Sequence, residues 1–185
     1  KLFRYFIPLV ILLVSFIYRF YGLWNNHPFW VDEFSSAQQA NLLLQNGSNA
    51  LNNPFINIEQ HNLITPSIIA FFFKLLGRQE WIARLPFSII GSFVPVLMYI
   101  SGQKIYDSRT GLVAAILTSL SYFQIVWSRQ ARGYVLAQLL ILITFLLYLR
   151  IKDSLANPKD TNLKINVVLL ATIVVISLLA HGLYL

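Results

Sequence analysis

The sequence predicts an all-α integral membrane protein, and three observations carry that prediction. Hydrophobic residues make up 57% of the 185 positions and charged residues only 11%, and the mean hydropathy is +0.63. These values lie outside the range of ordinary water-soluble domains. The apolar residues form blocks of roughly 17 to 22 residues, and about 20 helical residues cross a hydrocarbon core. The charged residues fall mainly between the blocks. We therefore expect one helical transmembrane domain over residues 1–185.

The apolar blocks predict about five spans. They cover approximately residues 5–21, 81–102, 111–127, 133–150 and 165–184. The first block follows basic residues, as a signal peptide would, but it lacks a small-residue cleavage site and ends in Tyr18, Arg19 and Tyr21. We expect it to be retained as a span.

Residues 22–80 form the one large loop that the sequence predicts, and it carries two interfacial helices. The first is expected over residues 33–46, where Asp32 can cap the amino end and Gly47 can end the helix. The second is expected over residues 63–76, an apolar stretch of the length typical of interfacial or buried helices.

The basic residues favour an orientation with the large loop outside. Lys and Arg are usually in excess on the cytoplasmic side, and this arrangement places eight of the 14 there. If residues 63–76 crossed the membrane, the count would be equal on the two sides. All four tryptophans then fall at the outer boundary, as in an aromatic belt: Trp24, Trp30, Trp81 and Trp127.

The composition also limits the kinds of chemistry available. The chain has no cysteine, which excludes disulfides, a thiolate nucleophile and cysteine metal sites. The net charge of +7 is scattered through short loops, so we expect no nucleic-acid partner. The spans are almost free of charge inside and show no internal repeat, which argues against half of a transporter.

Polar residues suited to catalysis gather on the outer side of this topology. Asp32 and Glu33 follow the first span, and a partly desolvated carboxylate can act as a general base. Arg84, Arg129 and Arg132 can bind a phosphate through paired hydrogen bonds. Tyr134 and the histidines at positions 61 and 181 are expected on the same side.

Three segments, in this order along the chain, are similar to motifs of one known family. The first is Trp30-Val31-Asp32-Glu33, an acidic motif in the first outer loop. The second runs from His61 to Arg84-Leu85-Pro86, a His-led motif followed by a surface helix and the start of a span. The third is Ser128-Arg129-Gln130-Ala131-Arg132-Gly133-Tyr134, which is similar to a Ser-x-x-Ala-Arg-x-Tyr turn. Together these segments resemble the dolichyl-phosphate-mannose protein mannosyltransferase superfamily, family 39 type, which includes the bacterial aminoarabinose transferases.

The resemblance implies the amino-terminal portion of a GT-C fold glycosyltransferase. Its donor would be a polyprenyl-phosphate-linked sugar, and its acceptor a hydroxyl on a protein, lipid or glycan of the cell envelope. Asp32 would be the base in an inverting reaction, and Glu33 would support it. The remaining site residues would bind substrate or phosphate: His61, Arg84, Arg129, Arg132 and Tyr134. The site would face outward from a plasma or inner membrane, or into the lumen of the endoplasmic reticulum.

Less specific interpretations remain open beside these. Asp32 could serve only as a helix cap, the arginines could extend from span ends to lipid head groups, Tyr134 could be an interface anchor, and His61 could be structural. A divalent cation beside Asp32 and Glu33 is the one cofactor that the residues suggest, because hard cations bind carboxylate oxygens. A non-catalytic membrane subunit or a transporter fragment is the alternative function.

Overall fold

The computed structural model describes residues 3–47, 64–156 and 163–181, and all regular secondary structure in that part of the chain is helical. The helices are α1 (Phe3–Phe20), the short 3-10 helix η1 (Leu23–Asn25), α2 (Val31–Asn46), α4 (Ile64–Leu76), α5 (Glu80–Ile105), α6 (Ser108–Leu120), α7 (Tyr122–Ser128), α8 (Tyr134–Ala156) and α9 (Leu163–His181). The all-α membrane fold that the sequence predicts is confirmed.

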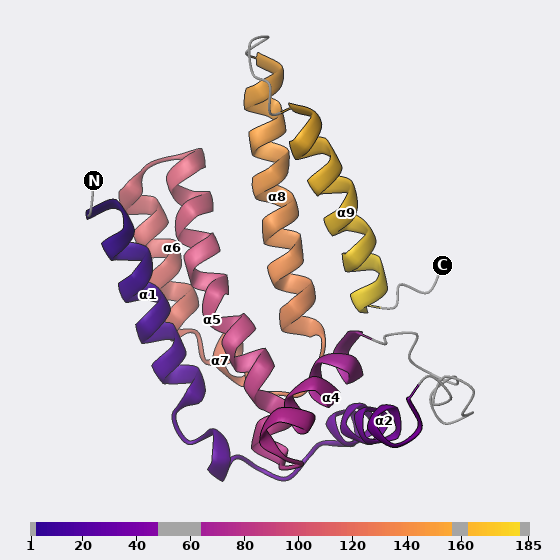
Figure 1. The fold of residues 1–185 in the computed structure, drawn as a ribbon. Coiled ribbons are helices and arrows are strands. Elements are labelled where there is room, and N and C mark those ends of the chain that lie inside the picture. Colours follow the sequence, from indigo (N-terminus) through magenta and orange to yellow (C-terminus); the bar gives the residue numbers. More distant parts are fainter. Residues whose placement is uncertain (1–2, 48–63, 157–162, 182–185) are drawn as a thin grey trace.

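The long helices run roughly side by side, and the shorter ones lie across one end of them (Figure 1). α1, α5 and α6 pack together, α8 packs against α5 and α9, and α2 packs against α4. α2, α4 and α7 all lie at the lower end in Figure 1, which we call the site end. The amino terminus and the α5–α6 connection lie at the opposite end.

Three stretches are long and apolar enough to cross a membrane: Phe6–Asn25, Glu80–Ile105 and Tyr134–Ala156. The apolar block predicted as one span over 111–127 corresponds instead to two helices, α6 and α7, which are bent by 60° at Ser121. Together these two helices could form a fourth, broken span.

α5 is the central helix, and small residues let its neighbours approach closely. At the end away from the site, a Cβ on Gly102 would lie 2.7 Å from the Cα of Gly111 in α6. At the site end, a Cβ on Gly91 would lie 2.4 Å from the Cβ of Ser128 in α7. Close backbone approach at small residues is typical of helix packing in membranes. Ile82, Phe87 and Val94 of α5 are buried in one core cluster with residues of α2, α4 and α8.

α2 begins two residues before its predicted start, which changes the role of Asp32. Trp30, with extended backbone dihedrals, is the N-cap, so Asp32 lies within the first helical turn and the prediction that it caps the helix is wrong. The backbone N–H of Trp30 donates instead to the carboxylate of Glu33 at 3.2 Å. Gly47 ends the helix with φ 54°, and its N–H donates to the carbonyl of Leu43, as expected for a glycine C-cap.

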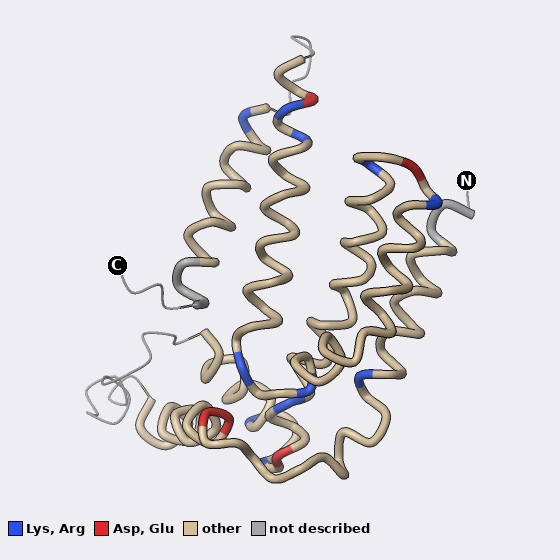
Figure 2. Tube along the Cα trace, turned by 180° about the vertical axis from the view of Figure 1, so that it is seen from behind, with Lys and Arg blue, Asp and Glu red and all other residues tan. Residues whose placement is uncertain are grey.

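Charged residues lie toward the two ends of the bundle, and the lengths of helix between them are nearly free of charge (Figure 2). The opposite end holds Lys104 and Asp153, whose side chains form an ion pair at 2.9 Å. The site end holds the acidic and basic residues singled out from the sequence.

Candidate active site

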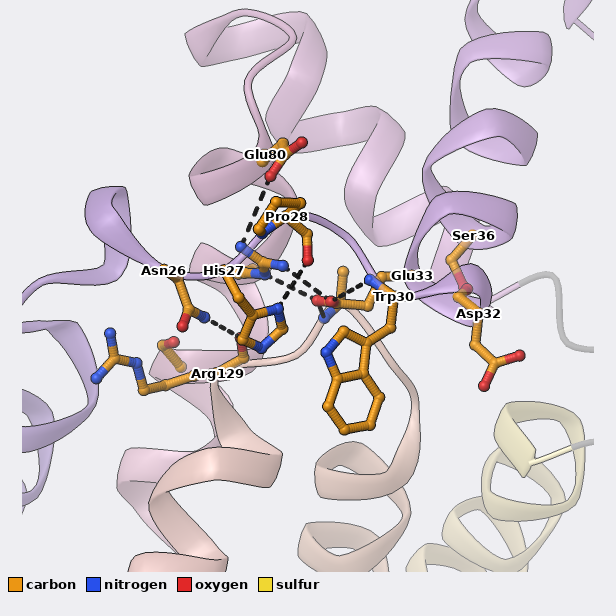
Figure 3. Close-up of polar contacts among 12 residues, drawn as sticks. Asn26, His27, Pro28, Trp30, Asp32, Glu33, Ser36, Glu80 and Arg129 are labelled. Atoms are coloured by element: carbon orange, nitrogen blue, oxygen red, sulfur yellow. Dashed lines mark hydrogen bonds and ion pairs between the residues drawn. The ribbon is translucent and has the colours of Figure 1, made fainter.

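The carboxylate of Glu33 is the centre of the polar network at the site end (Figure 3). Its side chain is fully buried and accepts four hydrogen bonds. Arg84 in α5 donates from Nε to Oε1 at 2.8 Å and from Nη2 to Oε2 at 2.9 Å. The backbone N–H of Ala131 donates to Oε1 at 2.9 Å, and that of Trp30 donates to Oε2. One side chain therefore joins α2, α5 and the turn between α7 and α8.

These contacts keep Glu33 ionised despite its burial. Burial alone would raise the pKa of Glu33, but the hydrogen bonds from Arg84, Ala131 and Trp30, together with the Arg84 charge, lower it below its ordinary value. Such a two-point bond to a guanidinium is the strong form of ion pair. The Arg84 guanidinium also lies 4.9 Å above the ring of Phe29. The pair is well satisfied, so the cost of burying both charges is offset.

Asp32 turns away from Glu33 and contacts a different arginine. Its Oδ2 lies 2.6 Å from Nη1 of Arg132, and the Asp32 side chain is 46% exposed while that of Arg132 is 19% exposed. The Arg132 guanidinium is also 4.5 Å from the ring centroid of Tyr134. The Tyr134 ring meets Trp127 edge to face at 5.1 Å. The Asp32 carboxylate is therefore accessible, and its partner Arg132 is held in place by the ring of Tyr134.

Arg129 occupies the same turn as Arg132 but lies on the other side of Glu33 from Asp32 (Figure 3). Its backbone carbonyl accepts a hydrogen bond from Asn26 at 3.4 Å, and its Nη2 lies 3.9 Å from the place where a Cβ of Gly22 would be. Burial, and then the nearby charge of Arg84, lower the pKa of Arg129. Its Nε is buried without a hydrogen-bond partner in the described part of the chain.

The structure therefore brings together most of the residues predicted for the site, in two groups. Glu33 and Arg84 form a buried pair, and Asp32, Arg132 and Tyr134 form an accessible group beside it. Arg129 is close to the buried pair but separate from Asp32. His61 lies outside the described residues.

The geometry does not fit a cation shared by Asp32 and Glu33. Both oxygens of Glu33 already accept hydrogen bonds from Arg84 and from backbone amides, and Asp32 points away from them. Within residues 3–47, 64–156 and 163–181, no three His, Asp or Glu side chains are grouped as metal ligands.

Sequence reasoning missed the residues that place the Arg129–Arg132 turn against α5. The hydroxyl of Ser88 donates to the carbonyl of Ser128 at 3.2 Å, and both side chains are fully buried. Gly91, one helical turn further along α5, leaves room for the side chain of Ser128. The sequence feature that could have indicated this contact is the placement of two small residues, Ser88 and Gly91, on one face of α5.

The fold and the site together define an integral membrane protein with a charged, partly exposed site at one end of its helical bundle. Comparison with protein families identifies it further. A family model described as dolichyl-phosphate-mannose-protein mannosyltransferase matches residues 60–160, and the chain belongs to this family. The resemblance seen in the sequence is thereby confirmed, and the family places the chain among membrane glycosyltransferases. No curated protein and no solved structure matched the chain.

Proposed function

We propose that this chain carries the catalytic base of a membrane glycosyltransferase that transfers a sugar from a polyprenyl-phosphate carrier to an acceptor hydroxyl. The observation that carries the proposal is the ion pair between Asp32 and Arg132, because it sets an accessible carboxylate beside a guanidinium with donors to spare. Family membership supports the transfer of a sugar. The donor, the acceptor and the residue roles are our proposal.

The reaction balances with one base and one cation. The Asp32 carboxylate takes the proton of the acceptor hydroxyl as its oxygen attacks the anomeric carbon. The bond between that carbon and the phosphate oxygen breaks, and the lipid phosphate leaves with the electron pair. Attack opposite the leaving group inverts the anomeric configuration. Arg132 stabilises the charge that grows on the phosphate, an effect that is large in a site with little water.

Arg132 can serve both the base and the phosphate at once. A guanidinium has five N–H donors, and Nη1 is the donor paired with Asp32. The ring of Tyr134 packs against one face of the Arg132 guanidinium. In an inverting reaction the base and the leaving phosphate lie on opposite faces of the anomeric carbon, so the phosphate would take the Arg132 donors that point away from Asp32.

Glu33 and Arg84 act on the reaction by holding these groups in place. Glu33 is fully buried and engaged on both oxygens, so it is not available to an acceptor hydroxyl. It fixes the first turn of α2, which carries Asp32, against the turn that carries Arg132. We assign Glu33 a positioning role.

The site would face the outer or lumenal side of the membrane, where acceptors for lipid-linked sugars are found. The proposed orientation rests on the sequence count, which assigns eight of the 14 Lys and Arg residues to the cytoplasmic side. The acceptor would be a protein, lipid or glycan hydroxyl.

The test is a donor comparison in membranes that contain the full-length protein. Sugars linked to polyprenyl phosphate would be offered beside the same sugars linked to nucleotides, and membranes without the protein serve as the blank. Transfer from at least one lipid-linked donor and from none of the nucleotide donors supports the proposal. Transfer that requires a nucleotide donor, or no transfer from any donor, contradicts it.

A further inference from the structure

Arg19, in the last turn of α1, is a fully buried cation without an ion pair in the described part of the chain. Its Nη1 donates to the hydroxyl of Ser15 at 2.6 Å and to the Ser15 carbonyl at 3.3 Å. The same guanidinium reaches across to α6, where Nη2 lies 3.4 Å from the carbonyl of Thr118 and Nη1 lies 3.5 Å from that of Ser119. A fully buried cation without an ion pair is costly, which makes a specific role the default expectation.

The two carbonyls lie where the broken span is interrupted. α6 ends at Leu120, α7 begins at Tyr122, and the two helix axes differ by 60°. The last carbonyls of a helix lack partners within it, and a membrane offers little water to replace them. Arg19 supplies donors to two of these carbonyls and also places a positive charge at the negative end of the helix dipole. The break is therefore stabilised from α1.

The sequence around the break contains no glycine or proline that would impose it. Residues 108–128 are apolar enough for α6 and α7 together to pass as a membrane span. Ser121 caps the start of α7, but its hydroxyl accepts from the Gln124 N–H at 3.5 Å, a long hydrogen bond. A continuous helix is the obvious competing structure, and Arg19 favours the broken one.

The position of the break decides where the site turn lies. α7 ends at Ser128, whose carbonyl accepts from Ser88 and whose side chain fits against Gly91. Arg129 to Arg132 follow directly. If α6 continued straight, Ser128 would be carried away from this face of α5, and Arg132 would leave Asp32.

We propose that Arg19 is a positioning residue that keeps the span broken at Ser121 and so holds the Arg129–Arg132 turn against α5. The effect on transfer rests on the proposed function, whereas the effect on conformation does not. Arg19 contacts neither Asp32 nor Arg132, so its action on the site passes through α6 and α7.

A second substitution that restores the break without Arg19 would test the proposal directly. Tyr122 is the first residue of α7, a position that proline favours, and its side chain is 82% exposed. Ser121 before it has φ −62° and ψ 117°, the extended region that a residue before proline prefers. Tyr122→Pro should therefore enforce the break without help from Arg19.

The experiment compares the full-length protein with Arg19→Gln, Arg19→Lys and the double variant Arg19→Gln/Tyr122→Pro. Spin labels at Val113 in α6 and Ile141 in α8, both exposed, report the bend by pulsed EPR, and residues 1–185 contain no cysteine that would compete for the label. We expect Arg19→Gln to shift or broaden the distance distribution and to lower kcat at least tenfold. Arg19→Lys should give a distance distribution and a kcat between those of the native protein and Arg19→Gln. The double variant should regain the native distance and most of kcat.

A native distance distribution in Arg19→Gln would overturn the proposal, as would a double variant that remains as altered as Arg19→Gln. If Arg19→Gln fails to accumulate in membranes, accumulation of the double variant supports the proposal and its failure to accumulate overturns it. If the native protein transfers no sugar, the proposed function fails, and the distance measurements still decide the role of Arg19.

Discussion

The carboxylate of Asp32 lies 2.6 Å from the guanidinium of Arg132, and this pair is the accessible part of the site. The next residue, Glu33, belongs to a buried pair with Arg84 instead. Two neighbouring acids are thus assigned different environments by the start of α2. One can meet a substrate, and the other fixes the helix that presents it.

Replacing Arg132 should weaken transfer more than it weakens folding. Arg132→Gln removes the charge that would face the leaving phosphate, and we expect kcat/KM to fall on the order of 10²-fold to 10³-fold. Arg132→Lys keeps the charge but loses the planar fork, so it should fall in between. Steady-state transfer with a lipid-linked donor measures both variants. Arg109→Gln, an exposed change at the opposite end, is the control, and an equal loss there would contradict a specific role for Arg132.

Breaking the Glu33–Arg84 pair should destabilise the protein because it leaves a buried charge without its partner. We expect Glu33→Gln or Arg84→Gln to lower the free energy of unfolding by about 3–5 kcal/mol. The double variant should cost much less than the sum of the two, since it leaves neither charge unpaired. Unfolding of the purified protein in detergent measures this cycle. Additive losses would show that the two side chains do not depend on each other.

The stability of the protein should fall in acid partly through Glu33. The folded-state pKa of this carboxyl lies below its ordinary value of 4.5. Its contribution to stability is therefore complete above that value and is lost as the pH falls toward the folded-state pKa. Unfolding midpoints from pH 7 down to pH 3 would report this loss. The Glu33→Gln protein should show a smaller decline, and an unchanged decline would assign the acid sensitivity to other groups.

Gly91 should tolerate no larger residue while Ser128 keeps its side chain. A Cβ on Gly91 would meet the Cβ of Ser128 at 2.4 Å, and forcing extra atoms into a packed contact costs about 1–3 kcal/mol. Gly91→Ala should lower both stability and transfer. Gly91→Ala/Ser128→Gly removes the opposing Cβ and should recover part of both, as measured by unfolding and transfer assays. Failure of this exchange to recover either property would mean that the contact does not position the turn.

The sequence was sufficient for the helical membrane fold and for most of the site's members. Apolar blocks predict helices in any membrane, and the order of acidic, arginine-bearing and turn motifs placed Asp32, Glu33, Arg84 and Arg132 on one side. The motifs could not predict which acid pairs with which arginine, because each of the two acids could pair with any of the three arginines. Only the start of α2 at Val31 turns Glu33 inward and Asp32 outward.

The break at Ser121 was not predictable from local pattern for a related reason. Hydropathy is continuous through residues 111–127, and the stretch has no helix-breaking residue after Gly111. The break depends on Arg19, which is remote in sequence and reaches α6 only in the folded bundle. Likewise, Asp32 resembles a helix cap in sequence, whereas the cap position falls on Trp30 because Glu33 accepts its N–H.

The most direct test of the central claim is single-turnover sugar transfer by Asp32→Asn in the full-length protein, with donor binding measured in parallel. Asp153→Asn, which removes an exposed carboxylate at the opposite end, is the matched control. We expect Asp32→Asn to lose transfer on the order of 10³-fold or more, within the range that loss of a general base produces in a dry site. Donor binding should persist, because Arg132 is then free for the phosphate. Transfer by Asp32→Asn at a rate close to that of the native protein would contradict the assignment of Asp32 as the base.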